Sequence, residues 1–365
     1  MLRILIALTI ALTLFGCETQ EKKTDIGFLG TLSGRYSDLG QDTLKGAMLA
    51  LEESGADESV NLVVKDDKGI PSEGLSAMSS FESADIRYII GPSISNVATA
   101  VTPYLDGRYM FMLSPTVSTS ELAGKDDHFM RTMPHNSRRQ AENISRYLIT
   151  KMNIKDMVII YDSRNSSYAG DLVKNATETF ISRGGRIRDI RAFNPESGES
   201  MNTLIMKDKN NPPQMYYILA SAMDTALIIW QIKKAEFKSK ILIRAWALSN
   251  EFFRFSGEAG DDVYLFDYYI DKNTKQYTAF RSRYMKKYRQ EPSWFSLYGH
   301  ESMVMMIHAL PDLEKGASFY DAVSAAARHL ELIPEFSFDE YGDSYMPLNL
   351  FVTKSGKTER IGLAE

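Results

Sequence analysis

The chain has few of the residues on which many catalytic and metal sites depend. Its 365 residues include one cysteine and five histidines. A single cysteine excludes an internal disulfide, so the fold must be stabilised by its core alone. The histidines lack the spacing of a zinc motif such as HExxH, and the sequence has no P-loop, G-x-G-x-x-G or G-x-S-x-G motif. These absences argue against an enzyme, and we predict no catalytic residue, no metal site and no cofactor.

Net charge and hydropathy argue against two further classes, nucleic-acid-binding proteins and proteins with several membrane spans. The formal net charge is −5, which argues against nucleic acid as a partner. Beyond the N-terminus, no apolar stretch approaches the about 18 residues that a membrane-spanning helix needs. With 44% hydrophobic and 24% charged residues, the composition is that of an ordinary globular protein, and the length is enough for two domains.

The N-terminus carries the one long apolar stretch. Arg3 precedes the segment ILIALTIALTLF, which is followed by Gly-Cys. A charged start and a short apolar segment are typical of a secretory signal. The sequence LFGC also resembles the bacterial lipoprotein signal, which implies a signal peptide of residues 1–16, lipid on Cys17 and a tether of residues 17–24. Glu18 would favour the outer membrane in a Gram-negative cell. An ordinary secretory signal with a chance cysteine is the alternative.

Strands and helices alternate along the rest of the chain. The first half predicts strands at 25–30, 60–67, 86–91 and 109–113, with helices at 39–55, 72–83 and 95–105. The pattern restarts with a helix at 138–152, followed by strands at 156–162, 186–193, 214–220, 240–246 and 262–269. Helices at 168–185, 223–235 and 249–256 lie between these strands, and helices near 274–289, 294–310 and 317–330 follow them. Strands at 335–339 and 348–354 finish the chain. This order predicts parallel sheets with helices on both faces. Because no low-complexity linker separates the halves, we expect the chain to cross between two lobes more than once.

Four strand-to-helix junctions are rich in small polar residues. They lie at 32–41, 91–96, 114–120 and 161–170. In open α/β sheets, ligands bind beyond the carboxyl ends of the strands. Three of the junctions precede a helix, whose N-terminal N–H groups and dipole attract anions such as a carboxylate. Helix capping by the same residue types is the alternative at each junction. Four such junctions in two successive halves favour a shared cleft.

The order and spacing of several motifs resemble a known family. The motifs are IGFLGTLSGRYSDLGQDTLKGAMLALEE, YIIGPSISNVATAV, MLSPTVSTSELAGKDDHFMRTMPHN and VIIYDSRNSSYAGDL. Together they resemble the periplasmic solute-binding proteins of the branched-chain amino acid (Leu/Ile/Val-binding) type. The resemblance implies the type I periplasmic binding fold, an α/β fold of two Rossmann-like lobes with parallel central sheets and a three-crossing hinge.

The same resemblance divides the chain. We expect crossings near 135–140, 268–272 and 333–340. The N-terminal lobe would comprise residues 25–137 plus 270–335, and the C-terminal lobe residues 138–269 plus 336–365. A ligand would be held between the two lobes, which would open and close by a hinge motion.

Family motifs also nominate ligand contacts. In the first lobe the resemblance implies that Ser95, Thr116 and Ser118 hold the carboxylate of a ligand. In the second lobe it implies an aromatic contact from Tyr168.

One position departs from the family pattern. Amino-acid binders of this family usually carry an acid after the strand predicted at 240–246, to meet the ligand ammonium, but Trp246 and Ala247 stand there. Either Asp224 supplies the charge, or the ligand has no ammonium and Trp246 stacks on an apolar part of it. Packing of Trp246 inside its own lobe is a further alternative.

These observations predict a periplasmic, lipid-anchored solute-binding protein. It would deliver a small carboxylate-bearing ligand, an amino acid or a related organic acid, to an ABC permease. It would contact the membrane through its N-terminal lipid and would not bind nucleic acid. Two alternatives stay open: a ligand-sensing module for a receptor, and a degenerate clamp that serves envelope assembly without a small ligand.

Overall fold

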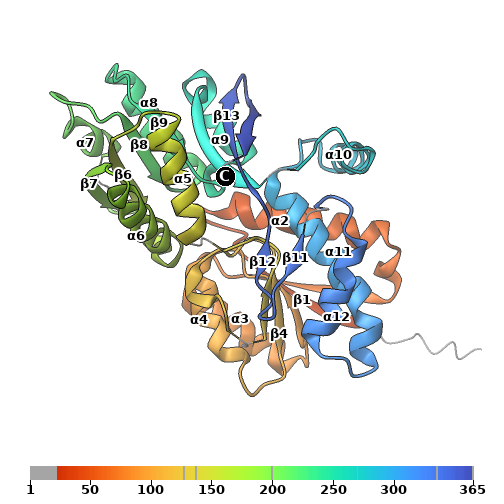
Figure 1. Ribbon diagram of the computed structural model, residues 1–365. Helices are drawn as coiled ribbons and strands as arrows, with labels where there is room; N and C mark the ends of the chain where they lie inside the picture. The colour runs from red at the N-terminus through yellow and green to blue at the C-terminus, as the bar shows by residue number, and fades with distance from the viewer. Residues whose placement is uncertain are drawn as a thin grey trace, which may run out of the picture.

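The structure is a computed structural model that describes residues 23–125, 128–135, 138–198, 200–268, 270–333 and 336–363. The predicted signal peptide, Cys17 and Glu18 lie outside these residues. The described chain folds into two α/β lobes, each built on its own sheet (Figure 1). The predicted α/β class with two lobes is therefore confirmed.

The first lobe contains a five-stranded parallel sheet in the order β2-β1-β3-β4-β5. Helices cover both of its faces. Phe28 of β1 packs with Met303 on the side of α2, α11 and α12, whereas its neighbour Leu29 belongs to the cluster that holds Phe81 of α3. Successive strand residues point to opposite faces, so one apolar strand supplies both cores. The elements are β1 (Thr24–Gly30), β2 (Val60–Asp66), β3 (Tyr88–Ile90), β4 (Phe111–Ser114), β5 (Phe129–Arg131), α2 (Ser37–Glu53), α3 (Pro71–Ser83), α4 (Ser95–Leu105), α11 (Trp294–Glu314) and α12 (Phe319–Ala326).

Two glycines allow the close approach of α2 and α11. A Cβ at Gly46 would lie 1.8 Å from the carbonyl oxygen of Ser296, and a Cβ at Gly299 would lie 2.1 Å from that of Thr43. Any larger residue would push the helices apart. This contact joins a late segment of the chain to an early one, and so it places residues 294–314 in the first lobe.

The second lobe contains a seven-stranded sheet in the order β14-β13-β10-β9-β8-β6-β7. It is parallel from β10 to β7, and β13 and β14 add an antiparallel edge. Its centre is apolar, as the buried run Met157–Ile160 of β6 illustrates. The elements are β6 (Asp156–Asp162), β7 (Arg186–Phe193), β8 (Met215–Leu219), β9 (Lys240–Ile243), β10 (Val263–Tyr268), β13 (Leu348–Lys354), β14 (Lys357–Leu363), α5 (Arg138–Thr150), α6 (Ser166–Ser182), α7 (Met201–Met206), α8 (Ala222–Lys234) and α9 (Asn250–Ser256).

The chain passes between the two sheets three times. It leaves the first lobe after β5, returns after β10 to α10 (Lys275–Tyr288) and α11, and leaves again between β12 (Ser344–Tyr345) and β13. The third passage differs from the expectation of 333–340, because β11 (Ser337–Phe338) and β12 form a hairpin beside the first lobe (Figure 1).

Hydrogen bonds fix the position of this hairpin. The backbone N–H of Arg131 donates to the carbonyl of Gly342 at 3.1 Å, and the hydroxyl of Ser344 donates to the carbonyl of Thr132 at 2.8 Å. The fully buried guanidinium of Arg131 lies 2.7 Å from the carboxylate of Asp343. Residues 336–345, which we expected in the C-terminal lobe, therefore lie against β5 of the first lobe.

Most predicted elements agree with the structure to within a few residues. β6, β7 and β13 have the expected bounds. Four short or edge elements, β5, α7, β12 and β14, were not predicted. The strand expected at 240–246 ends at Ile243, because Ala245–Ala247 form a 3₁₀ turn. That turn places Arg244 and Trp246 at the carboxyl edge of the sheet.

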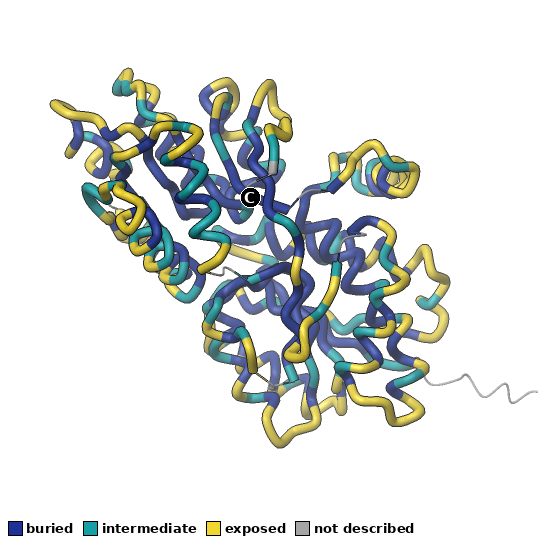
Figure 2. Tube along the Cα trace, viewed as in Figure 1, coloured by how far each residue is buried: buried dark blue, intermediate teal, exposed yellow. Residues whose placement is uncertain are grey.

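Buried segments run through the centre of both lobes, whereas exposed residues lie on the outer helices and loops (Figure 2). Among the helices of the described part of the chain, none has the length and apolar character needed to cross a membrane.

Candidate ligand-binding site

A pocket lies between the lobes at the carboxyl ends of the strands. It is partly open to solvent, and both lobes contribute to its lining. Five of the six predicted contact residues line it: Ser95, Thr116, Ser118, Tyr168 and Trp246. The first lobe also contributes Leu39, Ser93, Ile94 and Phe295, the second lobe Asn165, Arg244, Ala245, Asp267 and Tyr268, and the first crossing Met133 and Pro134.

The N-terminus of α4 forms part of the first-lobe wall. Ser95 is the first residue of α4 and is buried, and the N-cap residue Ile94 makes no side-chain cap. The N-caps of α2 and α6, Tyr36 and Asn165, make no side-chain cap either. Capping by the polar residues of their junctions therefore does not explain these three helix starts. The positive end of the α4 dipole lies at the pocket, where it favours an anion.

The hydroxyls of the first lobe differ in what they can donate. Ser114 donates to the carbonyl of Pro92 at 2.9 Å, and Thr116 donates to the carbonyl of Ser93 at 2.7 Å. A hydroxyl has one proton, so Thr116 can accept a hydrogen bond from a ligand but not donate one. The Ser93 hydroxyl is buried and has no hydrogen-bond partner among the described residues. Ser93 and Ser95 are thus better placed than Thr116 to donate to an anion.

The end of the same loop joins the two lobes. Thr119 donates to the carboxylate of Asp171 at 3.1 Å, and the hydroxyl of Ser120 donates to it at 2.6 Å. Asp171 belongs to α6 of the second lobe. Half of the hydroxyl-rich loop therefore faces the pocket, and the other half holds the lobes together beside it.

Aromatic side chains dominate the second-lobe wall. The ring of Trp246 lies 5.2 Å from that of Tyr168, at an interplanar angle of 75°. It also lies 5.5 Å from the ring of Tyr36, which comes from the first lobe. Such tilted and edge-to-face pairs are favourable beyond the area that they bury. Trp246 therefore packs between two tyrosines and also borders the pocket. Its position is compatible both with contact to a ligand and with packing inside the protein.

The described lining residues include two charged side chains, Arg244 and Asp267, and both come from the second lobe. Burial alone lowers the pKa of Arg244, but the facing Tyr217, Tyr168 and Asp267 raise it overall, so the guanidinium stays charged. Burial raises the pKa of Asp267 to about 6, although Arg244 acts in the opposite direction. The pocket thus combines neutral donors on one wall with a cation and an acid on the other.

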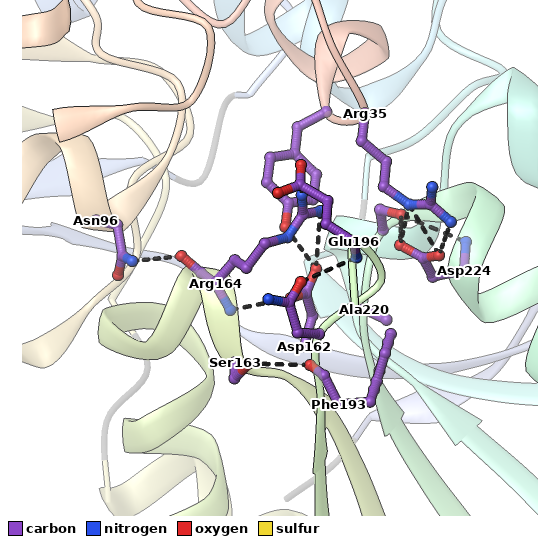
Figure 3. A network of polar contacts seen from close by, with 12 residues as sticks. Arg35, Asn96, Asp162, Ser163, Arg164, Phe193, Glu196, Ala220 and Asp224 are labelled. Carbon is purple, nitrogen blue, oxygen red and sulfur yellow. Dashed lines mark hydrogen bonds and ion pairs between the residues drawn. The ribbon is translucent and has the colours of Figure 1, made fainter. Parts of the chain in front are cut away.

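Asp224, the sixth predicted contact, lies outside the pocket lining. Its carboxylate is fully buried and receives the guanidinium of Arg35, with Nε at 3.0 and 2.9 Å from the two oxygens (Figure 3). This hydrogen bond raises the pKa of Arg35. Arg35 belongs to the first lobe, so the pair is an ion pair between the lobes. Because its carboxylate is already matched by a cation, Asp224 is not available to a ligand ammonium.

A second set of contacts closes the cleft next to this ion pair. The hydroxyl of Tyr36 donates to the carboxylate of Asp162, and the guanidinium of Arg164 lies 4.7 Å from the centre of the Tyr36 ring. Ser249 of the second lobe donates to Asp38 of the first at 2.7 Å. Burial raises the pKa of Asp38 to about 6. We call the contacts of Arg35, Tyr36 and Asp38 with the second lobe the rim contacts.

The N-termini of α4 and α6 cap each other across the cleft. The backbone N–H of Asn96 donates to the side-chain oxygen of Asn165 at 3.3 Å, and that of Ser167 donates to the side-chain oxygen of Asn96 at 2.8 Å. The amide of Asn96 also donates to the carbonyl of Arg164 (Figure 3). These helix N–H groups therefore bond to protein atoms while the lobes are together and would bond to water when the lobes separate.

The pocket residues that sequence reasoning missed include three with polar or charged side chains, Ser93, Arg244 and Asp267. Arg244 and Asp267 stand at the ends of the apolar runs ILI and VYLF, and a charged residue at the carboxyl end of a buried strand is a usable signal. Ser93 was missed because the family motif singled out Ser95, two residues later in the same junction. Arg35 of the rim contacts carried no signal, because its partner is 189 residues away.

The pocket is arranged for binding. In the described part of the chain, no three His, Cys, Asp or Glu side chains are grouped so that they could hold a metal ion. What the pocket offers is hydroxyl donors, a helix N-terminus, aromatic surface and two opposite charges.

Comparison with known proteins agrees with this geometry. A family model described as periplasmic binding protein matches residues 23–341. The Leu/Ile/Val-binding protein homolog 3 of Brucella melitensis is 24% identical over 248 residues, which are 66% of this chain and 66% of that protein.

Solved structures share the fold over almost the whole chain. A solute-binding protein of an ABC transporter from R. palustris, in complex with benzoate, has a TM-score of 0.82 at 17% identity and covers 94% of this chain and 96% of its own. The branched-chain amino acid substrate-binding protein of Streptococcus pneumoniae, in complex with isoleucine, has a TM-score of 0.79 at 21% identity. The match covers 93% of this chain and 100% of that protein's chain. The chain belongs to the periplasmic binding protein family, and its relatives include binders of the branched-chain amino acid type, as the sequence motifs predicted.

Proposed function

We propose that this protein is an extracytoplasmic solute-binding protein that delivers a small carboxylate-bearing ligand to an ABC permease. The ligand would be an amino acid or a related organic acid. The observation that carries the proposal is the pocket between the lobes at the N-terminus of α4, which Ser93, Ser95 and Ser118 line. Hydroxyl donors beside a helix N-terminus fit a carboxylate.

Ligand binding would couple to closure of the lobes. The rim contacts and the mutual capping of α4 and α6 join residues of opposite lobes around the pocket. A ligand held by both walls stabilises the closed form and shifts the population toward it. A permease that recognises the closed surface would then take up loaded protein in preference to empty protein.

A thermal-shift screen of the purified protein tests the proposal. The panel would contain the twenty amino acids, aromatic acids such as benzoate, and short aliphatic carboxylates. A compound that binds the native but not the unfolded state raises the melting temperature. We expect at least one carboxylate to raise it and the matched amide or alcohol to leave it unchanged. If no compound of any class does so, the degenerate clamp without a small ligand is the better description.

Transport and sensing use the same pocket, and the test that separates them is uptake. Deletion of the gene should abolish uptake of the radiolabelled ligand identified in the screen. Uptake that continues at the wild-type rate, together with loss of a transcriptional response to the ligand, would favour the sensing alternative.

We also propose that lipid on Cys17 anchors the protein, in the outer membrane if the cell is Gram-negative, where Glu18 would favour that membrane. Cys17→Ala should move the protein from the detergent phase to the aqueous phase in a Triton X-114 partition. Mass spectrometry of the wild-type N-terminal peptide should show a diacylglyceryl group on Cys17. An unmodified Cys17 would contradict the anchor and leave the binding function intact.

A further inference from the structure

The first lobe carries an aromatic groove at the opposite edge of its sheet from the ligand pocket. Tyr88, Phe111 and Phe129 are the first residues of three neighbouring parallel strands, β3, β4 and β5, and all three line the groove. Phe319, the first residue of α12, lines it from the side of the lobe that faces away from the second lobe (Figure 1). We call this surface the aromatic groove.

The rings of the aromatic groove are stacked, and some of them are open to solvent. The ring centre of Phe111 lies 6.1 Å from that of Tyr88 and 5.1 Å from that of Phe319. Two further lining residues, Tyr109 and Tyr341, are 73% and 41% exposed. A contiguous aromatic surface that reaches water is typical of an interaction site.

The described chain begins at the edge of this groove. Thr24, the first residue of β1, lies with its hydroxyl 3.5 Å from the carboxylate of Glu314, which follows the groove residue Leu313. Burial raises the pKa of the Tyr88 hydroxyl, and the nearby Glu314 carboxylate adds to the rise. Glu314 therefore lies between the start of β1 and the rings.

The length of the predicted tether limits how far the groove can be from an anchor. Cys17 precedes Thr24 by seven residues. A fully extended chain of this length spans at most about 25 Å. Lipid on Cys17 would therefore keep Thr24, and the groove beside it, close to the surface of the bilayer that holds the lipid.

We propose that the aromatic groove contacts the lipid bilayer, with the exposed rings of Tyr109 and Tyr341 at the level of the headgroups. The proposal rests on the lipid anchor at Cys17 that is part of the proposed function. Tyrosine suits this depth, because its ring is apolar and its hydroxyl bonds to water or to headgroups. A short tether also raises the effective concentration of bilayer at the groove, so weak insertion of the rings is enough for contact.

The charge of the groove favours insertion of rings over electrostatic attachment. Among the described residues that line it, none is lysine or arginine, and Glu340 is acidic. Anionic headgroups attract clusters of basic residues, which this surface lacks. The contact should therefore depend little on salt. Because the ligand pocket lies at the carboxyl ends of the strands, contact at their amino ends leaves the pocket uncovered and the second lobe free to move.

A nitroxide label on the lipidated protein in vesicles tests the proposal. Lipid occupies the sulfur of the single cysteine, so Ala317→Cys at the groove introduces one free thiol and keeps every ring. Ile181→Cys, at an exposed position of α6 in the second lobe, is the matched control. The vesicles contain phosphatidylcholine and phosphatidylethanolamine. Oxygen concentrates in the bilayer and a nickel chelate stays in water, so the oxygen-to-nickel accessibility ratio at position 317 should exceed that at position 181 by about threefold or more.

Removal of the exposed rings separates contact by the groove from mere proximity to the anchor. Tyr109→Ser with Tyr341→Ser should lower the ratio at position 317 to the value at position 181. Phe255→Ser removes a partly exposed ring of the second lobe and should leave the ratio unchanged. Equal ratios at positions 317 and 181 in the otherwise unchanged protein, or a high ratio that survives the loss of both tyrosines, would overturn the proposal.

Flotation of the same samples with the vesicles shows whether the anchor is present. Protein that floats while its label at position 317 is exposed to water has the anchor without the groove contact, which overturns this proposal alone. Protein that does not float lacks the anchor, and both proposals then fail. A label shielded from oxygen and nickel alike, with dipolar broadening, would identify a second copy as the occupant and overturn the bilayer contact. Raising the salt from about 50 to about 500 mM should leave the ratio nearly constant, and a collapse of the ratio would contradict insertion of the rings.

Discussion

The two walls of the pocket use different chemistry. The polar groups of the first-lobe wall are neutral hydroxyls, with Ser93 and Ser95 at the start of α4 and Ser118 in the loop after β4, and none of its described lining residues carries a charge. The second-lobe wall holds Arg244 and Asp267 among aromatic rings. Under the proposed function, the first wall would bind the carboxylate that the candidate ligands share. The second wall would meet the parts in which they differ, so general affinity and selectivity would lie on opposite lobes.

Removal of hydroxyls from the first wall should have the largest effect. Ser95→Ala combined with Ser118→Ala should weaken binding of every carboxylate by about 100-fold or more, because a hydrogen bond to a charged group contributes about 1.5–3 kcal/mol. Calorimetry measures the affinity. Ser72→Ala with Ser76→Ala removes two exposed serines of α3 and should change nothing. An unchanged affinity in the pocket double variant would refute the role of these hydroxyls.

A substitution at Trp246 should show how much this pocket residue contributes to the stability of the protein. Trp246→Leu removes ring contacts to Tyr36 and Tyr168 and should lower the free energy of unfolding by about 1–3 kcal/mol. Urea unfolding measures it. Trp230→Leu, at a half-exposed position outside the pocket, loses the hydrogen bond from its indole N–H to the carbonyl of Phe255 at 3.0 Å and should cost less than about 1 kcal/mol. Equal losses in the two variants would mean that Trp246 does not pack the closed form.

The rim contacts should change affinity for all ligands without changing selectivity. Asp224→Asn or Arg35→Gln should each weaken binding about five- to tenfold, because each removes an ion pair that exists only between the lobes. Small-angle scattering should show a larger radius of gyration in the ligand-free variants. The double variant should be little worse than either single one, since both lose the same contact. Fully additive losses would contradict the pairing.

The smallest expected effect concerns pH and the closed form itself. The pKa of Asp38 is about 6 when Ser249 covers it, and an exposed aspartate titrates at about 3.9. The closed form therefore binds a proton more tightly than the open form, and lowering the pH from 7.5 to 5 should favour closure a few-fold. Scattering of the ligand-free protein at both pH values measures it. Asp38→Asn should reduce the difference, and an equal difference in the variant would exclude Asp38 as a source.

Much of the pocket was predictable because its residues stand at strand-to-helix junctions, where parallel sheets bind ligands. The local rule indicated the junctions, and the family resemblance then singled out Ser95, Thr116, Ser118 and Tyr168 within them. Trp246 was found because it breaks a family pattern. Junction rules apply to the carboxyl end of each strand, so the pocket could be placed before the lobes were assembled.

The parts that were missed depend on contacts between distant segments. Asp224, at the start of α8, was predicted to contact a ligand, but its carboxylate forms an ion pair with Arg35 of the other lobe. The hairpin at 337–345 was assigned to the wrong lobe, because two contacts with the first lobe fix its position. These are the ion pair of Arg131 with Asp343 and the hydrogen bond from Ser344 to Thr132, and each joins residues 212 positions apart in the chain. Asp267 was counted as a strand residue, although its place at the strand end sets its chemistry.

A crystal structure of the protein with the compound that gives the largest thermal shift would show whether the pocket binds a carboxylate. We expect a carboxylate within hydrogen-bond distance of Ser95 at the start of α4, with both lobes in contact with the ligand. A ligand that binds outside the pocket, or one whose carboxylate points away from the first lobe, would contradict it.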